Sequence, residues 1–205
     1  MQQTPLAPWF PLRLLISPNQ VFKELAGTRP DPYVMLFKYL VWFALLPPLL
    51  AYIGASIFGW RLGAAEPLFL PAGDLLLANM FYFAALLFGL VSTAVVSQWM
   101  ATTYGARQSI GIHFALVAVI AGPLVVGSVV HLFPHVFINI LVLIPALMWS
   151  MYLLFKGIPV ILKISPERGV LMASALIGYL LVAVVSLLGI TVALWSRGIG
   201  PSIGV

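Results

Sequence analysis

The chain has 205 residues, of which 62% are hydrophobic and only 7% are charged. A mean hydropathy of +1.11 with so few charges excludes an ordinary soluble domain and a disordered chain. The net charge of +5 suits anionic lipid headgroups, so it does not indicate nucleic-acid binding. The absence of cysteine excludes disulfides, cysteine-ligated metals and thiol nucleophiles. Composition therefore predicts an all-α integral membrane protein whose first partner is the lipid bilayer.

Residues 1–35 are predicted to form an N-terminal segment on the cytoplasmic side. Prolines interrupt this segment, and it lacks the continuous apolar stretch of a signal peptide. A short helix is expected within it, capped by Ser17, with Pro18 in its first turn and its end at Gly27. The helix is amphipathic, because its apolar residues share one face: Val21, Phe22 and Leu25. That face would lie on the membrane surface or pack against the rest of the protein.

Residues 36–205 contain five apolar runs, each of about the 20 residues that a helix needs to cross a bilayer. They are separated by short polar or turn-forming connections. The sequence therefore predicts one domain, a bundle of five transmembrane helices over residues 36–58, 75–101, 110–130, 136–155 and 170–195.

The basic residues are distributed unequally between the two sides of this arrangement. Eight lie on the side of the N-terminus: Arg13, Lys23, Arg29, Lys38, Arg107, Lys156, Lys163 and Arg168. Only Arg61 and Arg197 lie on the other side. The positive-inside rule therefore predicts a cytoplasmic N-terminus and an extracytoplasmic C-terminus in a bacterial inner membrane.

The stretch Tyr-Leu-Leu-Phe-Lys-Gly-Ile-Pro at residues 152–159, which runs into Ile-Ser-Pro-Glu-Arg-Gly at 164–169, resembles the junction between the fourth and fifth spans of the Yip family. Gly157 and Pro159 belong to its distinctive Gly-Ile-Pro element. The Ser-Pro before the N-terminal helix and the five-span layout strengthen the resemblance to the small bacterial inner-membrane members. The family often has Gly-Tyr before the proline of the third span, but this chain has Ala118–Pro123, so no role of that Tyr is carried over.

This resemblance implies five spans, a cytoplasmic N-terminus, and association of the chain with itself, as a homo-oligomer, or with other membrane proteins. It implies no known catalytic activity. In eukaryotic members it implies vesicle traffic through prenylated small GTPases, but the N-terminal segment of this chain is short for such contacts. The expected function is that of a non-catalytic membrane organiser or adaptor.

Familiar catalytic motifs are absent from the sequence, including the Gly-x-Ser-x-Gly elbow, the phosphate-binding loop and His-Glu-x-x-His. No carboxylate lies well inside a predicted span: the five are Glu24, Asp31, Glu66, Asp74 and Glu167. The sequence therefore predicts neither an enzyme nor a bound cofactor.

His131 and His135 are four residues apart, which on a helix would place both imidazoles on one face for a metal ion, together with Glu66 or Asp74. Pro134 lies between them, so helical spacing cannot be assumed. The favoured interpretation is two histidines at the membrane interface, without a metal. His113 is expected to form a hydrogen bond within the bundle.

Prolines lie near one depth in three predicted spans: Pro47 and Pro48, Pro123, and Pro145. Each removes a backbone hydrogen bond, and the carbonyls four residues earlier need other partners, at Phe43, Ala44, Val119 and Leu141. Transporters use such breaks to line sites at the midplane, so the alternative function is a small channel or transporter. Because no charged residue lies at that depth, we favour prolines that only shape the helices.

Small residues recur at four-residue spacing, which permits close contact between helices. The pairs are Ala51 with Ala55, Ala85 with Gly89, Ala118 with Gly122, and Ser174 with Gly178. The sequence leaves open whether these contacts lie within one chain or between protomers.

Overall fold

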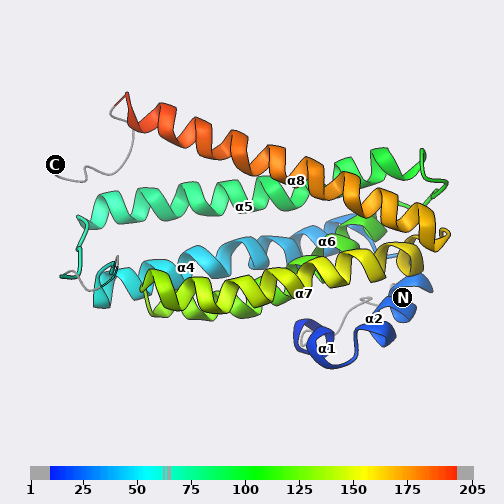
Figure 1. Cartoon of the computed structure of the whole chain (residues 1–205), viewed down its shortest axis with the longest axis horizontal. Helices are drawn as coiled ribbons and strands as arrows, with labels where there is room; N and C mark the ends of the chain where they lie inside the picture. Colours follow the sequence, from blue (N-terminus) through cyan, green and yellow to red (C-terminus); the bar gives the residue numbers. More distant parts are fainter. Residues whose placement is uncertain (1–9, 62, 64–65, 198–205) are drawn as a thin grey trace.

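The computed structural model describes residues 10–61, 63 and 66–197. Over these residues the chain is built from helices, as predicted (Figure 1). Five segments are long and apolar enough to cross a membrane, which confirms the five-span fold: Pro32–Phe58, Ala72–Ala101, Ile110–Leu132, Val136–Leu162 and Pro166–Trp195. The elements are α1 (Phe10–Ile16), α2 (Pro18–Ala26), α3 (Pro32–Met35), the π-helical η1 (Leu36–Leu40), α4 (Val41–Phe58), α5 (Ala72–Ala101), α6 (Ile110–Gly127), the 3-10 helix η2 (Ser128–Leu132), α7 (Val136–Leu162) and α8 (Pro166–Trp195).

The first span is continuous through α3, η1 and α4 and begins at Pro32, four residues before the predicted start. Asp31 explains this start, because its side chain accepts a hydrogen bond from the backbone N–H of Val34 at 3.0 Å. Pro32 then occupies the first helical position, where its missing N–H costs nothing.

The fourth span is longer than predicted, because α7 continues beyond residue 155 to Leu162. Pro159 lies inside its last turn, where only one helical hydrogen bond is lost. The helix ends at Lys163, which adopts the left-handed conformation at φ 57° and ψ 46°.

Helix α6 is the central element, and most of its residues are buried. It is apolar on all sides, the pattern expected of a helix surrounded by others. Glycines let two neighbours approach it closely. A methyl group at Gly111 would overlap the carbonyl oxygen of Pro30, and one at Gly122 would lie 2.9 Å from Leu14 Cδ1.

The N-terminal helices pack against the bundle, which is one of the two placements predicted for this segment. Val21, Phe22 and Leu25 have no exposed surface. The indole N–H of Trp149 on α7 donates a 3.1 Å hydrogen bond to the Leu14 carbonyl on α1. Gly122 lies twelve residues into α6, so α1 reaches about 18 Å along that helix. This segment therefore descends beside the spans.

The predicted cap at Ser17 is wrong. Its side chain makes no capping hydrogen bond, and its ψ of 56° lies outside the extended conformation of a capping residue. The reason is α1, which the sequence analysis did not predict. Ser17 is the single residue between α1 and α2, and its N–H bonds back to the Arg13 carbonyl at 2.7 Å.

The two ends of the bundle differ in packing. We call the end that carries Lys38, Arg107, Lys156, Lys163 and Arg168 the basic end, and the end with Gly59–Arg61 and Pro134–His135 the opposite end. The buried residues of α7 all lie between Ser150 and Leu162, and those of α8 between Gly169 and Leu176. Both groups lie toward the basic end. Toward the opposite end α8 diverges from α5 (Figure 1).

Candidate functional site

The Gly-Ile-Pro element of α7 is a packing centre at the basic end. A methyl group at Gly157 would lie 3.3 Å from Phe22 Cε1, so this glycine makes room for the ring of Phe22 on α2. A methyl group at Gly169 on α8 would lie 2.9 Å from Cβ and Cδ of Pro159. The element therefore holds α2, α7 and α8 together. We call its four contact residues the junction: Phe22, Gly157, Pro159 and Gly169.

Two further contacts hold the chain around the junction. Ser165 caps α8, because its side chain accepts a hydrogen bond from the N–H of Arg168 at 3.5 Å. The Arg168 guanidinium lies against Gly105, where an added methyl group would be 2.6 Å from Nη1. Gly105 has φ of 85°, so glycine is required there for the turn as well. The start of α8 thus also reaches the turn between α5 and α6.

The predicted proline positions do not share one environment. Pro47, Pro48 and Pro123 are buried, whereas Pro145 is exposed on the outside of α7. All four lie inside continuous helices. The residues four positions before these prolines, whose carbonyls lose a helical partner, also differ in exposure. Ala44 and Val119 have no exposed surface, whereas Leu141 is 74% exposed.

Ser97 on α5 and His113 on α6 form a buried polar pair, with Ser97 Oγ 2.8 Å from His113 Nδ1. This confirms the expected hydrogen bond of His113 within the bundle. A serine beside a histidine is the first half of a nucleophilic site. Neither residue has any exposed surface, however, and His113 Nε2 has no partner in the described part of the chain. Among the described residues, therefore, neither an orienting group nor an entrance for substrate accompanies the pair.

His131 belongs to a polar chain near the opposite end, which joins α5, η2 and α7. The amide nitrogen of Asn139 donates to the carbonyls of Phe133 and His135 at 2.9 and 3.0 Å, which fixes the orientation of this amide. Its oxygen therefore faces His131 Nδ1 and accepts a hydrogen bond from the N–H there. Nε2 is left as an acceptor, and the Tyr82 hydroxyl lies 3.4 Å from it.

Both ring nitrogens of His131 thus face hydrogen-bonding partners. His135 Nδ1 is buried and has no partner among the described residues. In the part of the chain that the structure describes, no three His, Asp or Glu side chains gather in a group that could hold a metal ion. The interpretation of His131 and His135 as interfacial histidines without a metal stays a prediction, and a metal site there stays its alternative.

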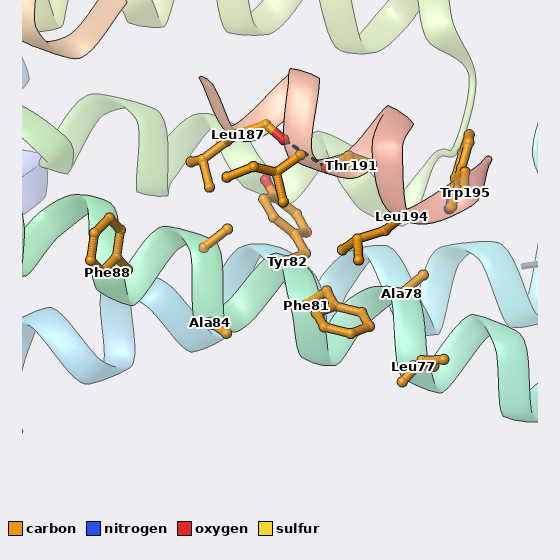
Figure 2. Close-up of a pocket in the computed structure, with 12 residues that line it drawn as sticks. Leu77, Ala78, Phe81, Tyr82, Ala84, Phe88, Leu187, Thr191, Leu194 and Trp195 are labelled. Carbon is orange, nitrogen blue, oxygen red and sulfur yellow. Dashed lines mark hydrogen bonds between the residues drawn. The ribbon is translucent and has the colours of Figure 1, made fainter. Parts of the chain in front are cut away.

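Two adjoining cavities lie toward the opposite end. The first, which we call the slot, has a volume of about 520 Å³ between Leu77–Phe88 of α5 and Leu187–Trp195 of α8 (Figure 2). The second, which we call the vestibule, has a similar volume of about 520 Å³ and is lined by parts of α4, α5 and η2. They share Ala78, Tyr82 and Trp195. The sequence analysis missed both, because no pattern in one helix shows where two helices diverge.

Comparison with known proteins identifies the family. The Yip1 domain matches residues 12–187, which is most of the chain. The chain belongs to the Yip family. Inner membrane protein YohC of Escherichia coli K12 is 31% identical over 160 residues, which cover 78% of this chain and 82% of YohC. Inner membrane protein YohC of Escherichia coli O6:H1 matches with the same identity and the same coverage. No solved structure matches the chain.

This Yip-family protein is thus a multi-pass protein of the bacterial inner membrane. The matched region begins inside α1 and includes the junction and both cavities up to Leu187. Neither the family description nor the name of the relatives designates an enzyme.

Proposed function

We propose that this protein acts without catalysis as an organiser or adaptor for other membrane proteins, and that α8 binds them. The observation that carries the proposal is a face of α8 without a neighbour in the bundle. At Gly178 and Gly189 an added methyl group would meet no atom of the described chain within 4 Å. At about 100° per residue, Val185 lies on the same face, and it is 67% exposed.

The partner that suits this face is a transmembrane helix. Small residues at an interface let two helix backbones approach closely, and in lipid such packing replaces the hydrophobic effect as the source of affinity. Ser174, four residues before Gly178, is exposed as well. Toward the opposite end α8 also carries large exposed apolar side chains on and beside this face: Leu181, Val182, Leu188 and Val192.

The proline placements support the adaptor over the channel or transporter. A midplane pathway would need the freed carbonyls of three spans to face one hydrated space. Instead Ala44 and Val119 lie within packed helices, and Leu141 faces outward. The burial of Ser97 and His113 likewise supports a role without catalysis.

For the orientation we propose a cytoplasmic basic end and an extracytoplasmic C-terminus. The support is the distribution of charge, since both connections at the basic end carry Lys or Arg, whereas Arg61 lies at the opposite end. Alkaline phosphatase fused after residue 205 should be active. An active cytoplasmic reporter at this position would contradict the orientation.

The adaptor role is tested by purification from native membrane in mild detergent, with mass spectrometry of the proteins that accompany the chain. We expect a stoichiometric companion that is lost in Gly178→Ile and Gly189→Ile, because a larger side chain holds the helices apart. Val184→Ile is the matched control, since Val184 is exposed about 120° around α8 from Gly178. A chain that purifies alone in every case would contradict the proposal.

A further inference from the structure

The slot runs along α5 from Leu77 to Phe88, and the eleven residue steps between them rise by about 16 Å in a helix. The hydrocarbon layer of one leaflet is about 15 Å thick, half of a core of about 30 Å. Helix α5 begins at Ala72, near the opposite end. The slot therefore has about the depth of one leaflet, and it runs from near the opposite end to about the middle of α5.

The lining of the slot is almost entirely hydrocarbon. In Figure 2 Leu187 and Leu194 of α8 point toward α5, and Tyr82 points from α5 toward α8. The hydroxyl of Thr191 donates to the Leu187 carbonyl of its own helix at 2.9 Å, so it offers the slot little polarity. Among the described residues that line the slot and the vestibule, none is Lys, Arg, Asp or Glu. An uncharged hydrocarbon chain matches such a lining.

The vestibule supplies neutral hydrogen-bonding groups where the slot approaches the interface. Asn79, Tyr82 and His131 line it. Asn79 donates one N–H to the Leu75 carbonyl at 2.8 Å, and its second N–H is left to donate to an ester carbonyl. Trp60 and Trp195 also line the vestibule, and indoles favour the glycerol level of a bilayer.

We propose that the slot holds one acyl chain of a phospholipid from the leaflet at the opposite end, with its glycerol-ester region in the vestibule. The length of one leaflet and the uncharged lining favour an acyl chain as the occupant. This lipid site goes beyond the adaptor role. Leu187 follows Gly178 by nine residues, so the slot and the proposed partner face lie about 180° apart on α8.

The test uses proteoliposomes of phosphatidylethanolamine that contain a phosphatidylethanolamine with a photoreactive diazirine in one acyl chain. After irradiation, mass spectrometry locates the adducts. We expect them concentrated on Leu77–Phe88 and Leu187–Trp195. Ala85→Phe fills the slot and should reduce these adducts at least about tenfold, which corresponds to about 1.4 kcal/mol. Ala193→Phe, the same change at an exposed position outside the lining, should leave them unchanged.

Further experiments distinguish a phospholipid from other occupants of the slot. Asn79→Leu should weaken retention of phosphatidylethanolamine in native mass spectrometry by roughly threefold to tenfold, through loss of one hydrogen bond from Asn79 to an ester carbonyl. Photoreactive palmitate should label the slot less than the phospholipid does, because an ionised carboxylate finds no cation in the lining. Adducts spread evenly over all lipid-facing helices and insensitive to Ala85→Phe would overturn the proposal. So would protein cross-links from the slot to a second copy or another helix.

Discussion

Replacing Gly169 by Ala tests whether the junction is a rigid contact. The added methyl group would lie 2.9 Å from Cβ and Cδ and 3.1 Å from Cγ of Pro159. A pyrrolidine ring cannot rotate away, so α7 and α8 must separate by several tenths of an ångström. Overpacking of this kind costs about 1–3 kcal/mol. Gly178→Ala on the same helix meets no atom within 4 Å and serves as the matched control.

The magnitude follows from the difference between the two variants. Ala is favoured over Gly in a helix by about 1 kcal/mol, a gain that both substitutions share. We therefore expect Gly178→Ala to be neutral or up to about 1 kcal/mol stabilising, and Gly169→Ala to be about 1–3 kcal/mol less stable than that control.

The assay is reversible unfolding of the purified chain in mixed micelles of dodecyl maltoside and sodium dodecyl sulfate, followed by circular dichroism. Equal stability of Gly169→Ala and Gly178→Ala would refute the reasoning, because the contact of Gly169 with Pro159 would then carry no free energy.

Three further predictions concern the helix ends and the N-terminal segment. Arg13 donates to Glu24 at 2.7 and 3.1 Å, and this hydrogen bonding lowers the pKa of Glu24 below its ordinary value. The stability that this ion pair gives the N-terminal segment is therefore present above the ordinary pKa of a glutamate. It is lost as the pH falls through the lowered pKa of Glu24. Limited proteolysis of the N-terminal segment in detergent should accelerate only in that acidic range, and Glu24→Gln should remove this pH dependence. If the pH profile of Glu24→Gln were unchanged, Glu24 would not be its cause. Asp31→Ala should reduce the free energy of unfolding by about 1 kcal/mol, and Ser17→Ala should reduce it by less than about 0.5 kcal/mol. The reason is that, of these two residues, only Asp31 makes a capping hydrogen bond. A larger loss for Ser17→Ala than for Asp31→Ala in the micelle assay would refute this order. Lys163→Gly should raise stability by about 1 kcal/mol because it relieves a left-handed conformation in a residue with a side chain; a fall in the unfolding midpoint would refute it.

The five spans were predictable because hydrophobic length is a property of each segment alone. The same property explains α6, whose apolar residues continue around the helix and place it at the centre. The end of α7 was harder to predict. Lys156 and Pro159 indicate a boundary after Phe155, yet the helix continues to Leu162, because its buried face there packs on α2.

The relations between distant segments could not be read from the sequence. Phe22 fits against Gly157 across 135 residues, and no local pattern connects them. The misplaced cap at Ser17 has the same origin, since α1 precedes it and takes its N–H. The link between His131 and Tyr82 depends on how α5 and η2 pack, so the sequence predicted interfacial histidines but missed the vestibule beside them.

The central claim is that α8 binds another membrane protein, and photo-crosslinking in native membranes tests it most directly. A photoreactive amino acid is placed at Val185, on the open face of α8, and in a second variant at Leu141, on the exposed side of α7. The account predicts a discrete protein adduct from Val185 that Gly178→Ile removes, and no such adduct from Leu141. The same pattern from both positions, or lipid adducts alone at Val185, would contradict the claim.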